Sequence, residues 1–198
     1  MKYFPVVHRC LLAGLLALLL SLPACNEKSA FVNSDITGLD FAKDFSLTDH
    51  NGKARTLADF KGKAVLVFFG YTQCPDVCPT TLAEMATVMQ QLGAQADKLQ
   101  VLFITVDPER DTQALLSKYV PAFDPRFLGL YGDAAATAKV TKDFKVFYQK
   151  VPGKEVGNYT MDHTAGSYVF DRQGRARLFV RHGQGAAPIV HDIKTLLN

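Results

Sequence analysis

The strongest constraint on the fold is a short apolar run that ends in glycine and leads directly to two cysteines. Residues 64–70 read AVLVFFG, and Cys74 and Cys78 follow, each with a proline after it. A continuous apolar run of this length, rich in valine and phenylalanine, is typical of a strand that is buried on both faces. Apolar residues then recur at spacings of three and four over residues 79–92, which predicts a helix. The sequence therefore predicts a buried strand that delivers two thiols to the start of a helix.

The N-terminus has the features of an export signal. Two basic residues precede an apolar run at residues 11–20, which is too short to span a bilayer comfortably. The Leu-Pro-Ala-Cys sequence that follows, at residues 22–25, resembles a bacterial lipobox. We predict a lipoprotein signal peptide at residues 1–24, lipidation of Cys25 and a lipidated tether at residues 25–40. A signal peptide that is cleaved nearby, or an uncleaved anchor, is the alternative.

This processing would place the protein on the periplasmic side of a bacterial cell envelope, held to a membrane by its lipid. Cys10 would be removed and Cys25 would be acylated, so that Cys74 and Cys78 would be the remaining thiols. A disulfide between positions four apart closes a very short loop and stabilises little. The pair is therefore expected to serve chemistry. A formal net charge of +3 without a dense basic tract gives no support for nucleic-acid binding.

The rest of the chain alternates between strand and helix patterns. Asn51-Gly52 lies between two short alternating runs, which predicts an N-terminal β-hairpin. Alternation through the middle of the chain, followed by two strands across a tight turn, indicates a mixed sheet covered by helices. With a cysteine pair at a helix start, this order predicts an α/β, thioredoxin-like domain over residues 41–198. The expected helices are residues 79–92, 112–123, 133–145 and 186–197.

Two cysteines at this spacing allow either metal binding or redox chemistry. A helix start offers free backbone N–H groups and the positive end of the helix dipole, both of which are expected to lower the pKa of the thiols. Residues four apart share one helical face, so the two sulfurs are expected to converge. Two thiolates do not complete a stable Cu(II) site, so Cu(II) would need a third donor, for which imidazole is suited. The candidates are His50, His163, His182 and His191, of which His50 beside the turn is expected to be solvated.

Three motifs in order resemble the SCO/SenC family: GYTQCPDVCP at residues 70–79, VDPERDT at residues 106–112 and DHT at residues 162–164. The resemblance implies a thioredoxin-like domain that binds copper, as Cu(I) or Cu(II), through Cys74, Cys78 and His163. It also implies a role in assembling the binuclear copper site of cytochrome c oxidase subunit II. Asp107, Asp111 and Asp162 match acidic positions of these motifs. They are expected either to hydrogen-bond with residues around the ligands or contact a docked partner, or to cap helices.

The sequence therefore predicts a membrane-tethered copper chaperone. Its expected partners are cytochrome c oxidase subunit II, an upstream copper donor and a disulfide reductant. The alternative is an enzyme, a thiol-disulfide reductase for copper-site cysteines, in which Cys74 attacks and Cys78 resolves. A peroxiredoxin-like peroxidase is disfavoured because Tyr71 stands where that family has threonine or serine. In a purely structural interpretation, the pair would form an inert crosslink.

Overall fold

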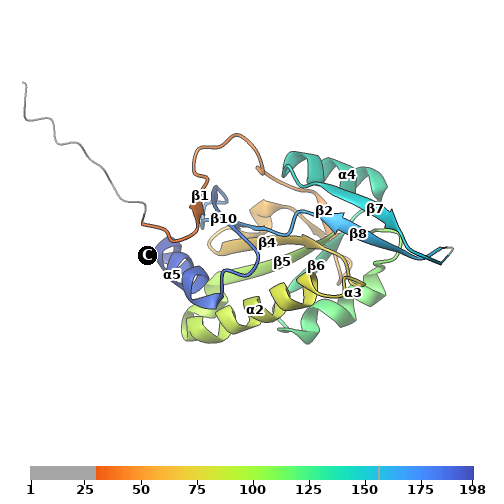
Figure 1. Cartoon of the computed structure of the whole chain (residues 1–198). Coiled ribbons are helices and arrows are strands. Elements are labelled where there is room, and N and C mark those ends of the chain that lie inside the picture. The colour runs from red at the N-terminus through yellow and green to blue at the C-terminus, as the bar shows by residue number, and fades with distance from the viewer. Residues whose placement is uncertain (1–29, 156) are drawn as a thin grey trace, which may run out of the picture.

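A single mixed sheet forms the centre of the molecule (Figure 1). The computed structural model describes residues 30–155 and 157–198, so the predicted signal peptide and Cys25 lie outside the described residues. The strands are β1 (Ser34–Asp35), β2 (Leu47–Asp49), β3 (Ala54–Arg55), β4 (Ala64–Gly70), β5 (Leu99–Thr105), β6 (Leu128–Tyr131), β7 (Tyr148–Pro152), β8 (Tyr159–His163), β9 (Ser167–Phe170) and β10 (Ala176–Val180). The α-helices of this part of the chain are α2 (Val77–Leu92), α3 (Gln113–Tyr119), α4 (Ala134–Asp143) and α5 (Ala186–Leu197).

The predicted mixed sheet is confirmed. Its eight strands run in the order β1-β10-β9-β4-β5-β6-β2-β3. Strand β4 pairs in parallel with β5 and antiparallel with β9, and β5 pairs in parallel with β6. Every residue of β4 and β5 is buried. The continuous apolar run of β4 predicts this burial, whereas β5 also buries two polar residues, Gln100 and Thr105. These central strands fix the direction in which the chain after Gly70 leaves the sheet.

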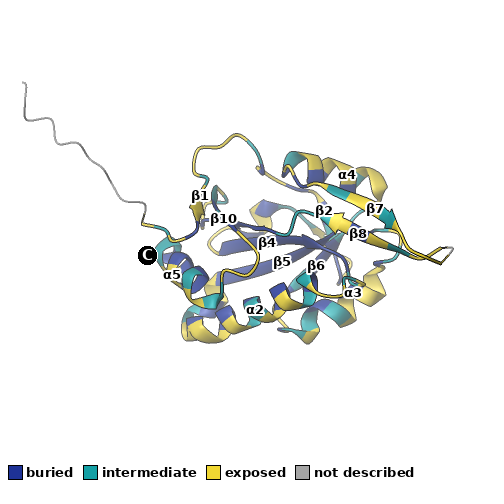
Figure 2. Ribbon diagram, viewed as in Figure 1, coloured by how far each residue is buried: buried dark blue, intermediate teal, exposed yellow. Residues whose placement is uncertain are grey.

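Helices cover both faces of this sheet (Figure 1). Helices α2 and α5 pack against each other below the sheet in this view, and α4 lies above it. The helices bury one side and expose the other (Figure 2). In α2 the apolar residues at spacings of three and four form the buried side, as predicted. No helix among the described residues is long and apolar enough to cross a membrane.

The predicted N-terminal hairpin is present, but one residue beside it was misjudged. Strands β2 and β3 pair antiparallel around the Asn51-Gly52 turn. His50, expected to be solvated, is 8% exposed, and its Nδ1 accepts a hydrogen bond from the backbone N–H of Gly129 at 3.0 Å. Because β2 also pairs with β6, the turn lies against the sheet edge and the imidazole is buried there. The expectation for His50 was therefore wrong.

The folded domain begins earlier than the predicted boundary at residue 41. Strand β1 pairs with β10 at the sheet edge, so the predicted tether of residues 25–40 overlaps the domain from Ser34. The buried carboxylate of Asp192 in α5 accepts hydrogen bonds from the backbone N–H groups of Val32 and Asn33, each at 2.8 Å. Such long-range contacts leave no local sequence pattern. In the sequence alone, the segment therefore resembles a linker.

Strands β7 and β8 form a separate two-stranded sheet, and their strand pairing is only with each other. This hairpin occupies the polar stretch between α4 and β9, and it projects beyond the main sheet (Figure 1). At its base, the backbone N–H of Thr164 donates to the carbonyl of Phe147. His163 is the last residue of β8, so the hairpin carries the predicted third ligand of the copper site.

Candidate metal centre

Cys74 and Cys78 lie where strand β4 passes into helix α2. The helix begins at Val77, so Cys78 is in its first turn and Cys74 is in the loop before it. The expectation that both cysteines share a helical face was therefore wrong. The sulfurs nevertheless lie close together. The backbone N–H of Cys78, in the first turn of the helix, donates to Sγ of Cys74 at 3.5 Å.

Gly70, the residue that closes β4, makes room for the buried sulfur. A Cβ atom on Gly70 would lie 2.8 Å from Sγ of Cys78, 2.8 Å from the ring of Phe103 and 2.9 Å from the ring of Phe68. Real Cβ atoms do not approach other heavy atoms this closely. Glycine is therefore required at the end of the apolar run, because any side chain there would collide with Sγ of Cys78 and the two phenylalanine rings.

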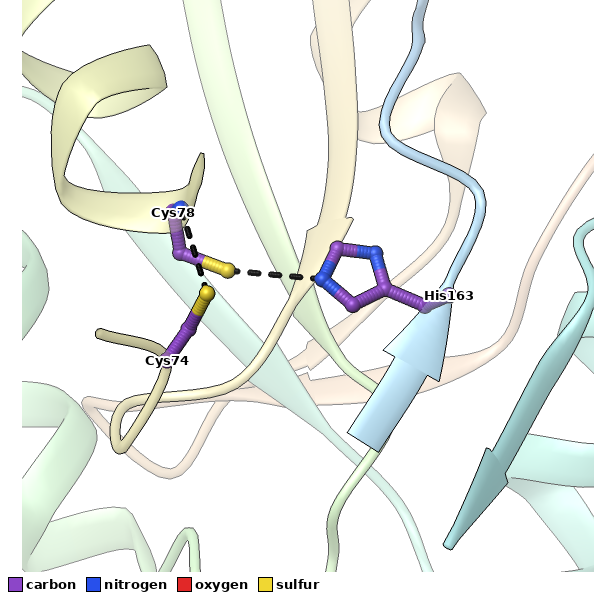
Figure 3. A group of neighbouring side chains, drawn as sticks. All are labelled: Cys74, Cys78 and His163. Atoms are coloured by element: carbon purple, nitrogen blue, oxygen red, sulfur yellow. Dashed lines mark hydrogen bonds between the residues drawn. The ribbon is translucent and has the colours of Figure 1, made fainter. Parts of the chain in front are cut away.

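His163 reaches the two cysteines from the hairpin (Figure 3). Its Nε2 lies 3.5 Å from Sγ of Cys78, and its Nδ1 lies 3.0 Å from the carbonyl oxygen of Thr164. A carbonyl oxygen only accepts, so Nδ1 carries the ring hydrogen and Nε2 keeps a lone pair that faces the cysteines. The rings of Phe68 and Tyr71 pack edge-to-face against the imidazole, at centroid distances of 6.2 and 6.0 Å.

Burial shifts the pKa values of Cys78 and His163. Cys78 is fully buried, and burial raises the pKa of its thiol far above the ordinary value. The expected lowering of the pKa of Cys78 by the helix N-terminus is therefore overturned by desolvation. Burial also lowers the pKa of His163, a shift that the hydrogen bond to Thr164 partly opposes. At neutral pH the Cys78 thiol donates to a neutral imidazole, and a bound metal would replace that proton.

The three side chains fit a metal ion. One ligand atom from each of Cys74, Cys78 and His163 lies within 4.8 Å of the others. Thiolate and imidazole donors suit copper and zinc, and thiolate favours Cu(I) among the softer ions. Ligands at about 2.0 and 2.3 Å from one ion lie about 3.5 Å apart at a tetrahedral angle, close to the Cys78–His163 separation. The structure brings the predicted residues together, and their role as metal ligands stays a prediction.

A surface cavity of about 370 Å³ opens beside these residues. It lies between the loop that carries Cys74 and strand β8, and Tyr71 forms part of its wall. Cys74 is half-buried and borders this cavity, whereas Cys78 is fully buried. Solvent and an incoming ligand therefore reach the pair from the side of Cys74.

The acidic residues of the motifs have different surroundings. Asp111 is buried and accepts from both the backbone N–H and the hydroxyl of Thr72, two residues before Cys74. Asp107 is buried and accepts from the hydroxyl of Tyr159 in β8. These contacts support the segments that carry the site. The capping alternative fails for Asp111, because Thr112 caps α3. Asp162 is exposed and lines the cavity.

The other candidate histidines have different partners. Nδ1 of His50 accepts from a backbone N–H, Nδ1 of His182 lies 3.1 Å from the hydroxyl of Thr81, and His191 pairs with Asp192. Among the described residues, the group that could hold a metal includes His163 and none of these three.

Sequence reasoning missed the residues that shape and support the site. Gly70 had a signal, because a glycine at the end of a buried strand marks a close approach. Tyr71 belongs to the first motif, but no sequence pattern indicates that its ring packs against His163. Thr164 fixes the tautomer of His163 through its backbone, for which no side-chain pattern exists.

The comparison with known proteins decides the family. The SCO1/SenC family model matches residues 34–198, which is most of the chain. This chain belongs to the SCO1/SenC family. The match begins at Ser34, which is also the first residue of β1. The predicted family is thereby confirmed.

Individual family members resemble the chain in sequence and fold. A mitochondrial SCO2 homologue from Bos taurus is 41% identical over 153 residues, which covers 76% of this chain and 58% of that protein. The chain thus spans less than two-thirds of the length of the first curated relatives it matches.

Solved structures of the family extend the likeness to three dimensions. The structure of Bradyrhizobium japonicum ScoI with copper bound is 49% identical, covers 78% of this chain and 98% of that chain, and has a TM-score of 0.72. Yeast Sco1 with copper bound is 30% identical, covers 79% of this chain and 88% of that chain, and also has a TM-score of 0.72. The predicted thioredoxin-like fold is confirmed, and the donor set and the family both support copper as the metal.

Proposed function

We propose that this SCO1/SenC protein is a membrane-tethered copper chaperone that supplies the binuclear copper site of cytochrome c oxidase subunit II. The observation that carries the proposal is the convergence of Cys74, Cys78 and His163, within 4.8 Å, in a family whose solved structures include copper-bound forms. The transfer partner and the tether are proposed from the sequence resemblance.

The residues of the site suit a cargo that must be released. Two sulfurs and one imidazole leave at least one coordination position open for a thiol of the partner. Copper binding has to displace the proton of Cys78, whose pKa is raised by burial, so affinity for the metal falls as the pH falls. His163 stays neutral at pH 7 because burial lowers its pKa, and its Nε2 therefore keeps the lone pair that a metal needs.

Titration of the reduced, purified chain with Cu(I) and with Cu(II) under anaerobic conditions tests the site. We expect Cys74→Ser to weaken and shift the thiolate-to-copper absorption, because only the Cys78 sulfur remains, and His163→Ala to weaken Cu(II) binding more than Cu(I) binding. His182→Ala is the matched control, because His182 lies outside the candidate site. Unchanged absorption and affinity in the Cys74 and His163 variants would refute the ligand assignment.

A second function, reduction of copper-site disulfides, is favoured by the unequal exposure of the two thiols. In this step the Cys74 thiolate attacks a disulfide sulfur of the target and releases one target thiolate. Cys78 then attacks the mixed disulfide, which yields an intramolecular Cys74–Cys78 disulfide and the second target thiol. The target gains two electrons and two protons, and this chain loses them. Reduction of an oxidised subunit II fragment by the copper-free chain would support this function, and its failure would exclude it.

The membrane tether rests on the sequence of residues 22–25. Lipidation of Cys25 would place the domain at the periplasmic face of a bacterial membrane, where copper sites of respiratory enzymes could be reached. Mass spectrometry of the mature protein tests this. A diacylglyceryl modification on an N-terminal Cys25 is expected, and Cys25→Ser should shift the protein from the membrane fraction to the soluble fraction.

A further inference from the structure

The position of His163 relative to the two cysteines is not fixed by the main sheet. The β7–β8 hairpin pairs only within itself, and it meets the rest of the fold through side chains and its two ends. The loop at residues 107–111, which follows β5, lies against both the hairpin and the segment that precedes Cys74. Contacts made by this loop therefore decide how the hairpin is oriented.

Arg110 contacts both of the segments that supply the candidate ligands. Its guanidinium carbon lies 3.5 Å from the ring centroid of Tyr159 in β8, and its Nη1 donates to the backbone carbonyl of Tyr159 at 2.8 Å. The same Nη1 lies 3.2 Å from the side-chain oxygen of Gln73, the residue before Cys74, and Nε donates to Asp107. A planar guanidinium can make these contacts together, whereas a lysine ammonium cannot.

The neighbours of Arg110 hold the same two segments. The carboxylate of Asp107 accepts from the hydroxyl of Tyr159 at 2.8 Å, and Asp111 accepts from the backbone and hydroxyl of Thr72. The Tyr159 ring also contacts the ammonium of Lys150, at 4.8 Å from its centroid. The hairpin is thus attached through Tyr159, whereas the segment before Cys74 is attached through Thr72 and Gln73.

Arg110 is held in this place at a cost. Its side chain is 17% exposed, and its Nη2 is buried without a hydrogen-bond partner among the described residues. A buried donor without a partner destabilises a fold. At the other end of β8, the ring of Tyr71 packs against the imidazole of His163, so the arginine acts on the half of the hairpin that is farther from the imidazole.

We propose that Arg110 is a positioning residue that orients the β7–β8 hairpin so that Nε2 of His163 stays beside the cysteine pair. The proposal rests on the proposed copper site. Two thiolates alone can hold Cu(I), whereas Cu(II) needs the imidazole. Loss of the guanidinium therefore weakens Cu(II) binding selectively and leaves Cu(I) binding close to that of the unmodified chain.

The test compares Arg110→Met with Arg55→Met in the full chain. Arg55 is a matched control: its side chain is 19% exposed, it pairs with the buried Asp49, and its guanidinium lies 5.6 Å from the ring centroid of Phe60, away from the site. We expect Arg110→Met to lower the affinity for Cu(II) about 10- to 100-fold, the range found for residues that support metal ligands. The affinity for Cu(I) should change less than threefold, and Arg55→Met should change neither affinity.

A copper-free measurement separates this proposal from the proposed function. Amide hydrogen exchange in the apo protein should become at least tenfold faster in β7 and β8 of Arg110→Met, with β4 and β5 unchanged. Faster hairpin exchange in a chain that binds no copper would refute the copper site and leave the positioning role in place. Unchanged hairpin exchange, unchanged Cu(II) affinity, or an equal loss in Arg55→Met would overturn the positioning role.

Discussion

Replacing Gly70 with alanine should damage the metal site while leaving the fold intact. The new Cβ would lie 2.8 Å from Sγ of Cys78, 2.8 Å from Phe103 and 2.9 Å from Phe68. Non-bonded carbon contacts are normally about 3.5–4.0 Å, so these three groups must together move by about 1 Å. Overpacking of a tight core costs about 1–3 kcal/mol of unfolding free energy. Metal–ligand distances tolerate only about 0.2 Å, so the displaced sulfur should lower the affinities for Cu(I) and Cu(II) at least tenfold.

Urea unfolding gives the stability, and anaerobic copper titration gives the affinity. The control is Gly129→Ala in β6, where the added Cβ would lie 3.0 Å from Val120, on the same sheet but outside the metal centre. Neither glycine has a positive φ, so alanine is compatible with the backbone at both positions. A folded Gly70→Ala chain with unchanged copper affinity would refute this reasoning. It would show that Sγ of Cys78 can move aside without any loss of metal binding.

Two other predictions concern buried polar groups. Because burial lowers the pKa of His163, the folded state binds fewer protons than the unfolded state just below the ordinary pKa of 6.5, so stability is lost as the pH falls through that value. In urea unfolding, His163→Gln should lose less unfolding free energy between pH 6.5 and 5 than the unmodified chain does. If both chains show the same pH profile, the pKa of His163 is not lowered in the folded state. Asp192→Ala leaves the N–H groups of Val32 and Asn33 without their acceptor, so we expect a loss of about 1–3 kcal/mol and faster proteolysis near residues 30–35. Resistance to protease equal to that of the unmodified chain would rule out this role for Asp192.

The sequence was most informative where local pattern and tertiary burial agree. The apolar run of β4 and the helical spacing of α2 are dictated by periodicity, and Asn51-Gly52 specifies its own turn. The motifs also led to Cys74, Cys78 and His163, which the structure places together.

What the sequence could not supply depends on contacts between distant segments. The burial of His50 follows from the pairing of β2 with β6, and the ordering of residues 32–35 follows from one carboxylate in α5. The rise in the pKa of Cys78 is also a property of the packed core, since the helix start alone suggests a fall. Local sequence carries no measure of desolvation, and so the sign of that shift was predicted wrongly.

The unequal burial of the two thiols gives the site a direction. Cys78 lies in the core beside Gly70, whereas Cys74 borders the surface cavity. For a metal held by both sulfurs, an approaching thiol can displace Cys74 first, with Cys78 as the last protein sulfur to let go. Ligand exchange would then follow a fixed order, in which Cys74 is the first sulfur to leave the metal during release. The buried Cys78 sulfur would keep the metal from diffusing away between partners.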